Sequence, residues 1–275
     1  MNKKIGFILA LVVISIVMLG TVSAGMFDFL GGGNSNKTAN DESTFIVGFE
    51  PQLPPFGYKD DSGNYTGFDL DLAKEVCERN NWTFKAQPIN WDAKDAELNS
   101  GTIDCFWNGF TIDGRENDYT WSNPYFENKQ IFVVKSSDNI KNTSDLKGKT
   151  VETQKNSSVL TALKGDNKTL AETFGKLTEV ADFNTALKDL ESGSCDAVAM
   201  DITVAEYDIK NKNNTDDFQI LNETITTEKY GVGFKKGNDA LKSQVQSTLD
   251  EMFKDGTVEK IAQKYGISMD SLIQP

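Results

Sequence analysis

The chain has no histidine among its 275 residues. This absence excludes Ser-His-Asp and Cys-His catalysis, imidazole ligands to a metal and histidine pH switches, and we expect neither a cofactor nor a metal ion. Cysteine is also scarce: Cys77, Cys105 and Cys195 stand far apart, in no Cys-x-x-Cys spacing, and each lies in an apolar stretch. We interpret them as buried small hydrophobic residues. One disulfide between Cys77 and Cys105 is the alternative, although the odd number of cysteines does not require it.

Arginine occurs at only two positions, Arg79 and Arg115, while lysine supplies the rest of the 28 basic residues. A guanidinium group binds a carboxylate through two parallel hydrogen bonds, which an ammonium group cannot do. Arg115 ends the stretch Gly101–Arg115 (GTIDCFWNGFTIDGR), which begins as a bulky apolar strand and breaks at Asn108-Gly109. This position favours recognition of a carboxylate, and an ordinary surface arginine is the alternative.

Composition and charge are typical of a soluble globular protein. Hydrophobic residues make up 38% and charged residues 25% of the chain, and its length is sufficient for two lobes that each bury a core. The formal net charge of −13 repels nucleic acid and anionic lipid, so we expect neither as a partner.

The N-terminal segment is typical of an exported protein. Two lysines precede an uncharged run over residues 5–24 that ends in Val-Ser-Ala, which predicts a secretory signal peptide over residues 1–24. The run is also long enough to cross a bilayer, so an uncleaved membrane anchor with the folded part outside the cytoplasm is the alternative. Both place the protein in the periplasm or at the cell surface. Residues 25–43 are rich in glycine and asparagine and predict a flexible linker.

From Thr44 onward, short apolar strands alternate with amphipathic helices, which is typical of an α/β fold. The expected strands are 45–49, 83–88, 103–107, 130–135, 151–154, 176–181, 197–201 and 230–234. The expected helices are 70–80, 91–99, 159–163, 183–190, 202–209, 239–253 and 257–265. Residues 119–125 are expected to form a loop.

One phrase occurs twice. Leu98–Asp104 reads LNSGTID and Leu190–Asp196 reads LESGSCD, 92 residues later. Each predicts a helix end, a glycine stop and an aspartate that begins a buried strand. Two α/β lobes with the same internal plan are the simplest explanation, and chance similarity between two helix–strand connections is the alternative.

Ligands of open α/β sheets bind beyond the carboxyl ends of the strands. The residues at those positions are Glu50, Asn108, Gly109, Thr111 and Arg115 in the first half, and Gln154, Ser157, Ser158 and Asp201 in the second. Arg115 and Asp201 would hold the two charged groups of a zwitterion, and the N–H groups at Ser157 add anion-binding capacity. Trp91 is a candidate aromatic wall. The alternatives are a helix N-cap for Asp201 and a core position for Trp91.

Several segments, in order along the chain, resemble the solute-binding proteins of polar amino-acid ABC transporters, family 3. They are GFDLDLAKEV (67–76), WDAKDAELNSGTIDCFWNGFT (91–111), WSNPY (121–125), DLKGKTV (145–151), SGSCDAVAMD (192–201) and DGTVEKIAQKYG (255–266). The resemblance covers nearly everything from Phe45 to Gly266. It implies a type II periplasmic-binding-protein fold, in which two lobes, each a mixed sheet flanked by helices, are joined by two hinge strands. Lobe 1 would span 44–130 and 232–275, and lobe 2, with the hinge strands, 131–231.

In that family an arginine binds the α-carboxylate of a free amino acid and an aspartate binds its α-ammonium group, and Arg115 and Asp201 fall on those positions. Other matching pocket positions are Glu50, Trp91, Gly109, Thr111, Gln154 and Ser158. The segment 111–115 is one residue shorter than the commonest family spacing, so we expect the arginine to approach slightly differently. Leu53 stands where many relatives carry an aromatic residue that stacks on the ligand, which leaves Trp91 as the aromatic wall.

The resemblance implies an exported, monomeric receptor that delivers a polar amino acid, neutral or basic, to an ABC permease. Its mechanism would be hinge closure, with hinge strands near 130–135 and 228–234. A carboxylate from Glu50 at the side-chain end of the pocket would disfavour glutamate and aspartate; alternatively, Glu50 faces the ammonium group. Two other functions are open: a dehydratase-type enzyme on the same scaffold with Glu50 as general acid, against which the intact clamp argues, and a ligand-sensing domain that works with a partner chain.

Overall fold

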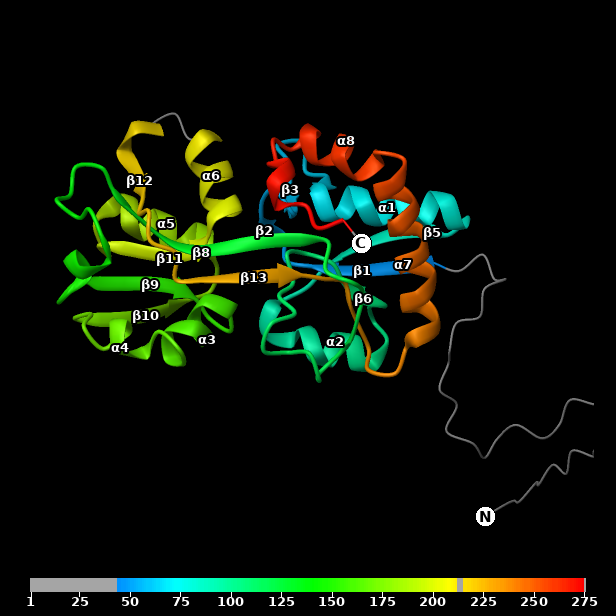
Figure 1. The fold of residues 1–275 in the computed structure, drawn as a ribbon, viewed down its shortest axis with the longest axis horizontal. Helices are drawn as coiled ribbons and strands as arrows, with labels where there is room; N and C mark the ends of the chain where they lie inside the picture. Colours follow the sequence, from blue (N-terminus) through cyan, green and yellow to red (C-terminus); the bar gives the residue numbers. More distant parts are fainter. Residues whose placement is uncertain (1–43, 212–214, 275) are drawn as a thin grey trace, which may run out of the picture. The chain divides into compact units, whose positions relative to one another are not determined.

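The computed structural model describes residues 44–211 and 215–274. Over these residues the chain forms two α/β lobes, each built on its own mixed sheet (Figure 1). The predicted signal peptide or anchor (1–24) and the predicted linker (25–43) lie outside the described residues. Within the described ranges, no helix has both the length and the apolar character needed to span a bilayer.

The first lobe is built on a five-stranded sheet of order β5-β1-β6-β14-β7. Its strands are β1 (Thr44–Phe49), β5 (Thr83–Pro88), β6 (Cys105–Phe106), β7 (Thr120–Trp121) and β14 (Gly233–Phe234). β1 runs parallel to β5 and β6, whereas β14 is antiparallel to β6 and β7. A small sheet of β2 (Gln52–Leu53), β3 (Gly57–Lys59) and β4 (Tyr65–Thr66) lies between β1 and the first helix in sequence. The helical segments are α1 (Phe68–Asn80), η1 (Trp91–Ala93), α2 (Lys94–Ser100), α7 (Asp239–Lys254), α8 (Thr257–Lys264) and η4 (Met269–Ser271).

The second lobe is built on a six-stranded sheet of order β10-β9-β11-β8-β12, with β13 also paired to β8. Its strands are β8 (Phe126–Lys135), β9 (Thr150–Gln154), β10 (Lys176–Val180), β11 (Ala197–Asp201), β12 (Phe218–Ile220) and β13 (Thr226–Tyr230). The helical segments are η2 (Thr143–Leu146), α3 (Ser158–Lys164), α4 (Lys168–Ala171), α5 (Phe183–Ser192), α6 (Ile202–Asn211) and η3 (Thr215–Asp217). The long strand β8 pairs antiparallel with β11, β12 and β13. It therefore lies between β11, the strand that ends in Asp201, and the strands β12 and β13.

Helix α1 begins at Phe68, two residues before the predicted start at Leu70. The first N–H groups of the helix, at Phe68 and Asp69, donate to the carbonyl oxygens of Pro55 and Phe56 at 2.7 and 3.0 Å. The preceding Gly67 has φ 143°, and a Cβ there would lie 2.2 Å from the carbonyl oxygen of Phe56. The proline-rich turn therefore satisfies the helix start with its backbone, and glycine is what allows the approach.

The two copies of Leu-x-Ser-Gly-x-x-Asp have the same structure. The glycine of each copy ends a helix in the left-handed conformation, with φ of 80° and 82°. Asp104 Oδ2 accepts a hydrogen bond from the N–H of Ile46 at 2.7 Å, and Asp196 Oδ2 accepts one from Thr150 at 2.7 Å. Ile46 lies in the first parallel strand of one lobe and Thr150 in that of the other, so each aspartate ties its strand to the equivalent neighbour. The interpretation of the repeat as two lobes with one plan is confirmed.

Four strands differ from the sequence expectations. The strand expected over 230–234 is divided, because β13 ends at Tyr230 and β14 begins at Gly233. Tyr230 still pairs with β8 in the second sheet, whereas Gly233 pairs with β6 and β7 in the first, so the chain passes from one sheet to the other between them. The expected loop 119–125 contains β7, and β12 was not predicted. The apolar stretch after Gly101 forms only the two-residue strand β6.

The cysteines pack as small hydrophobic residues. Cys77, Cys105 and Cys195 are all buried thiols, so the Cys77–Cys105 disulfide is not formed. Burial raises the pKa of the Cys77 and Cys195 thiols to about 12, which keeps them protonated and unreactive at neutral pH.

Candidate functional site

Every residue that the sequence predicted at the site lines one small cavity of about 30 Å³. Those residues are Glu50, Trp91, Asn108, Gly109, Thr111, Arg115, Gln154, Ser157, Ser158 and Asp201. Leu53, Phe110 and Phe183 complete the lining. Of these three, the sequence indicated only Leu53. Phe183 opens α5 directly after β10, a strand-end position of the kind that located the others.

The side chains meet because they follow the carboxyl ends of parallel strands. Glu50 follows β1, Gln154 ends β9 and Asp201 ends β11. Ser157 is the N-cap of α3: its Oγ accepts the N–H of Leu160 at 3.2 Å and donates to the carbonyl oxygen of Gln154 at 2.7 Å. The Ser157 hydroxyl is therefore engaged within the second lobe, where it holds the end of β9 against the start of the helix.

Arg115 brings a positive charge into the cavity. Its Nη1 and Nη2 donate to the carbonyl oxygens of Thr111 and Asn156 at 3.3 and 3.4 Å, and its guanidinium carbon lies 5.2 Å from the Phe110 ring centroid. Burial lowers the pKa of Arg115, although a guanidinium group stays charged in proteins. Among the described residues, no carboxylate oxygen lies within 4.0 Å of it.

The other arginine is fully engaged. Arg79 donates to Glu75 at 2.8 Å, to Asp255 at 2.8 Å and to Thr257 at 3.0 Å. These contacts tie α1 to the turn between α7 and α8. Among the described residues, Arg79 is therefore in direct contact with two carboxylates, whereas Arg115 is in direct contact with none.

Asp201 is buried and has several donors. Its Oδ1 accepts hydrogen bonds from Asn128 Nδ2 at 2.7 Å, from Gln130 Nε2 at 3.0 Å and from the hydroxyl of Tyr230. Burial raises the pKa of Asp201 to about 7, and the negative charge of Glu228 raises it further in the same direction. Asp201 also lines the cavity, so a cationic group there would meet a carboxylate that the protein does not neutralise.

Glu228 was not predicted at the site. It is 3% exposed, and its Oε2 accepts the Thr111 hydroxyl at 3.1 Å. One signal in the sequence could have found it: alternation along β13 places Glu228 on the face of the buried Tyr230. A carboxylate on the buried face of a strand is rare unless it has a role.

The carboxylate of Glu50 is bound by the side-chain amide of Gln154. Gln154 Nε2 donates to both of its carboxylate oxygens at 2.8 Å, and the backbone N–H of Glu50 donates to Asn108 Oδ1 at 2.8 Å. Burial raises the pKa of Glu50 to about 7; the Gln154 hydrogen bond opposes this shift and the charge of Asp182 adds to it. The cavity thus contains two carboxyl groups that ionise near neutral pH, Glu50 and Asp201.

Gly109 is held by another buried carboxylate, that of Asp69. Its N–H donates to Asp69 Oδ2 at 2.6 Å, and its φ of 55° is in the left-handed region. A Cβ there would lie 3.3 Å from both Phe56 and Tyr230. Burial raises the pKa of Asp69, which is fully buried, to about 7. Glycine at this position lets the chain turn from β6 into the cavity wall without strain.

Trp91 is half-buried and lines the cavity, so its position is not that of a core residue alone. Its ring centroid lies 5.5 Å from that of Phe110 in an edge-to-face arrangement. Its indole N–H donates to the carbonyl oxygen of Asn156 at 3.4 Å, which is also the acceptor for Arg115. The aromatic wall therefore consists of Trp91 and Phe110, with Arg115 against the second ring.

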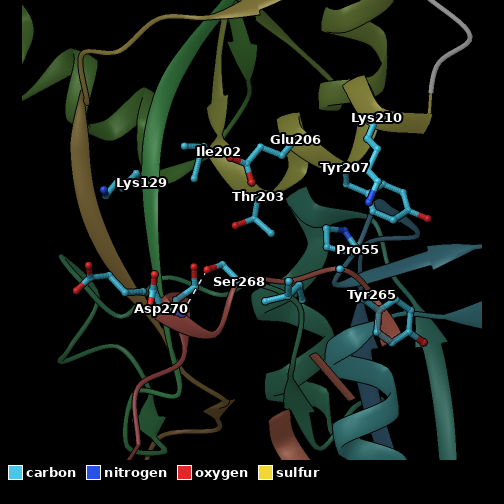
Figure 2. A pocket seen from close by; sticks show the side chains of 14 residues that line it. Pro55, Lys129, Ile202, Thr203, Glu206, Tyr207, Lys210, Tyr265, Ser268 and Asp270 are labelled. Atoms are coloured by element: carbon cyan, nitrogen blue, oxygen red, sulfur yellow. Dashed lines mark hydrogen bonds between the residues drawn. The ribbon is translucent and has the colours of Figure 1, made fainter. Parts of the chain in front are cut away.

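A second cavity of about 370 Å³ lies on the other face of β8. Glu127 and Lys129 line it, whereas Asn128 and Gln130, which alternate with them along the strand, reach Asp201. Figure 2 shows residues of α6 across from Pro55 and Tyr265 in this cavity. Its charged residues are exposed to solvent. They are Glu127, Lys129, Glu206, Lys210 and Asp270. The smaller cavity, with its buried charges, is therefore the candidate site although it is less roomy.

Comparison with known proteins agrees with this fold. The L-cystine-binding protein TcyJ of Escherichia coli (strain K12) is 31% identical over 254 residues, which cover 90% of this chain and 92% of TcyJ. An ABC uptake transporter substrate-binding protein from Streptococcus pneumoniae, solved with bound histidine, has a TM-score of 0.78 and 32% identity, covering 81% of this chain and 92% of that chain. The ancestral amino-acid-binding protein AncCDT-1, described as a precursor of cyclohexadienyl dehydratase, has a TM-score of 0.73 and 30% identity, covering 81% and 95%.

Residues 45–268 match the bacterial extracellular solute-binding proteins, family 3. The chain belongs to this family, and the two-lobed α/β fold that the resemblance implied is confirmed.

Proposed function

We propose that this chain captures one free amino acid outside the cell and delivers it, chemically unchanged, to the permease of an ABC transporter. The observation that carries the proposal is Arg115. Its guanidinium group lines the cavity without a carboxylate partner among the described residues, and the buried carboxylate of Asp201 lines the same cavity. A desolvated charge without a counterion is unfavourable. A zwitterion supplies both counterions at once.

In the proposed binding mode, the α-carboxylate of the ligand accepts hydrogen bonds from the guanidinium group of Arg115. Its α-ammonium group donates to Asp201, and the apolar part of the ligand lies against Trp91 and Phe110. Charge-assisted hydrogen bonds of this kind are about twice as strong as neutral ones. Arg115 and Asp201 are supplied by different lobes, so the ligand would join the lobes when it binds.

The Glu50 end of the cavity supports a polar ligand with a neutral or cationic side chain. A carboxylate that ionises near neutral pH attracts hydrogen-bond donors and repels a second carboxylate. Relatives named for cystine and found with histidine agree with this preference. We therefore exclude glutamate and aspartate from the expected ligands.

The mechanism we propose is hinge closure. β8 and β13 pair antiparallel from Phe126–Tyr230 to Gln130–Thr226, and two adjacent strands of this kind can bend together while each lobe moves as a unit. We assign lobe 1 to 44–130 and 232–275 and lobe 2 to 131–231, so that β8 crosses from one range into the other and β13 ends beside the second boundary. A monomer is sufficient, because the described residues of one chain supply every side chain of the cavity.

A dehydratase-type enzyme is less well supported. The family and the relatives above are described as binding proteins, and AncCDT-1 is itself described as amino-acid-binding. Glu50, the candidate general acid, has both oxygens covered by Gln154 Nε2. We therefore expect no turnover of the ligand.

For export, we retain residues 1–24 as a signal peptide or residues 5–24 as an anchor. A sensor that works with a partner chain would share the same ligand site.

The test is a thermal-shift screen of the protein with the twenty common amino acids and cystine, followed by calorimetric titration of each compound that stabilises it. We expect saturable binding, and Arg115→Ala to weaken it about a hundredfold, because a buried carboxylate loses its charged partner. Binding by Arg115→Ala within threefold of wild type would contradict the proposed site. Appearance of a new compound after prolonged incubation would favour the enzyme.

A further inference from the structure

Two buried carboxylates, Asp201 at the end of β11 and Glu228 in β13, use the same hydrogen-bond donors. Asn128 Nδ2 donates to Asp201 Oδ1 at 2.7 Å and to Glu228 Oε1 at 2.8 Å. Gln130 Nε2 reaches the same two oxygens at 3.0 and 2.6 Å. The two carboxylates are therefore close neighbours, and they are only 7% and 3% exposed.

The amide groups are oriented by this negative charge. Asn128 Oδ1 and Gln130 Oε1 are buried and have no hydrogen-bond partner among the described residues. Buried polar atoms without a partner are unfavourable. Both amides nevertheless point their N–H groups at the carboxylates and leave their oxygens unpaired, which is the arrangement that two acidic groups require.

The fold supplies little positive charge to the pair. No lysine or arginine nitrogen of the described residues lies within 4.0 Å of Asp201 or Glu228. The titratable groups that face the pair are Tyr230, which donates to Asp201 Oδ1, and Arg115, which feels the charge of Glu228. The other groups around the pair, from β8, from α3 and from the segment after β6, are neutral: Asn128, Gln130, Ser158 and Thr111.

We propose that Glu228 is a positioning residue of the amino-acid site, and that Asp201 and Glu228 hold one proton between them which the ammonium group of the ligand displaces. The inference rests on the proposed function, because it takes an amino-acid ammonium group to be the partner of Asp201. Like charges held this close do not both ionise readily. An incoming cation supplies the charge that lets them do so.

The protonation balance follows directly. In the free protein the pair carries one proton and one negative charge. The ligand enters with its ammonium group protonated and keeps that proton, the proton of the pair leaves to solvent, and the pair then holds two negative charges against the ammonium group. The pKa of Asp201, raised to about 7 by burial and by Glu228, places this exchange near neutral pH. Arg115 opposes it, because its positive charge favours the ionised pair.

The affinity for the amino-acid ligand should therefore decrease as the pH is lowered. Above pH 7 the pair is already ionised and no proton is released. Below pH 7 each unit of pH lowers the affinity up to about tenfold, because the ammonium group must first displace the proton. Glu228→Gln keeps the shape and removes one charge, so Asp201 should ionise at lower pH and the release at pH 7 should disappear.

The experiment is isothermal titration calorimetry with L-arginine and L-glutamine, whose side chains do not titrate between pH 5.5 and 8. Each titration is run at pH 7 in two buffers that differ in ionisation enthalpy, and the affinity is measured from pH 5.5 to 8. If only histidine or cystine binds, it replaces these probes, and its own protonation is measured and subtracted. For wild type we expect release of about half a proton at pH 7 and an affinity about tenfold lower at pH 6 than at pH 8.

Glu228→Gln should bind more weakly at pH 8, release less than a tenth as much proton, and keep its affinity within threefold between pH 6 and 8. Glu127→Gln, which replaces an exposed carboxyl group on the other face of β8, is the matched control and should retain the release. Glu50→Gln tests the other cavity carboxyl group that ionises near pH 7. Wild type that binds with the same enthalpy in both buffers would overturn the inference, as would release that survives in Glu228→Gln and vanishes in Glu50→Gln. Failure of every amino acid to bind at any pH would instead overturn the proposed function.

Discussion

The side-chain nitrogen of Gln154 lies 2.8 Å from both carboxylate oxygens of Glu50. One amide group thus faces both oxygens of a carboxyl group that is 8% exposed, and the two residues come from different lobes. A ligand side chain with its own N–H donors would compete with Gln154 for the same oxygens. We propose that this contact marks the part of the cavity that selects between ligands.

We expect Glu50→Gln to discriminate between ligands rather than abolish binding. At pH 8, where this carboxyl group is ionised, the variant should bind L-arginine about tenfold or more weakly than wild type, because a charge-assisted hydrogen bond is lost. Its affinity for L-glutamine should stay within threefold. Glu127→Gln, an exposed carboxyl group on the other face of β8, is the control. Equal losses for both ligands would contradict the assignment of Glu50 to the side-chain end.

Replacement of each arginine by lysine should separate the site from the scaffold. Arg115→Lys keeps the positive charge but cannot donate two parallel hydrogen bonds, and we expect about tenfold weaker binding by calorimetry. Arg79→Lys, whose partners Glu75 and Asp255 lie within the first lobe, should bind within threefold of wild type. If the two variants bind equally well, the two parallel hydrogen bonds of the Arg115 guanidinium group do not contribute to binding.

Asp69 should make the protein less stable as pH rises. Burial raises the pKa of Asp69 to about 7, so the folded chain binds this proton more tightly than the unfolded chain does. The stability that it contributes is complete below about pH 4 and is lost as pH rises to 7, roughly 2 kcal/mol of it between pH 5 and 7. Glu50 and Asp201 act with the same sign.

Asp69→Asn has no such proton to lose. We expect its free energy of unfolding, measured in urea, to change less between pH 5 and 8 than that of wild type. Glu127→Gln, in which an exposed carboxyl group is replaced, should follow the wild-type curve. An Asp69→Asn protein with the same pH dependence as wild type would show that this carboxyl group is not the source of the effect.

A hydroxyl contact between the lobes should affect affinity from outside the site. The Tyr207 hydroxyl donates to that of Tyr58 at 3.0 Å, with Tyr207 in α6 and Tyr58 in β3. Loss of one hydrogen bond in Tyr207→Phe is worth about 1 kcal/mol, and we expect about fivefold weaker ligand binding. Tyr265→Phe is the control, because its hydroxyl bonds only to residues of the first lobe, Thr66 and Asp71, among side chains. Unchanged affinity in Tyr207→Phe would contradict this prediction.

Much of the site could be predicted from the sequence because its signals are local. A glycine stop followed by an apolar run and a polar residue marks a strand end, and this pattern located both Asn108 and Asp201. The same pattern, read twice, indicated two lobes, and the hydrogen bonds of Asp104 and Asp196 give its physical reason. The roles of these residues toward a ligand stay predictions.

Glu228 could not be placed in this way, because its surroundings depend on strand register. Asn128 reaches both carboxylates only because β8 pairs with two strands, with Gln130 opposite Asp201 on one side and Asn128 opposite Glu228 on the other. The register of neither strand pair can be predicted from a local sequence pattern. The division between β13 and β14 has a similar origin, since the chain pairs with β8 up to Tyr230 and with β6 and β7 from Gly233 onward.

Glu50, Asp69 and Asp201 also make this protein suitable for spectroscopy. The absence of histidine from the chain removes the imidazole signals that usually overlap with titration near neutral pH. The infrared band of a protonated carboxyl group can therefore be followed as it appears and disappears, and replacement of one residue at a time assigns each band. The occupancy of the cavity by an ammonium group could then be recorded as the disappearance of a single vibration, without any label on the ligand.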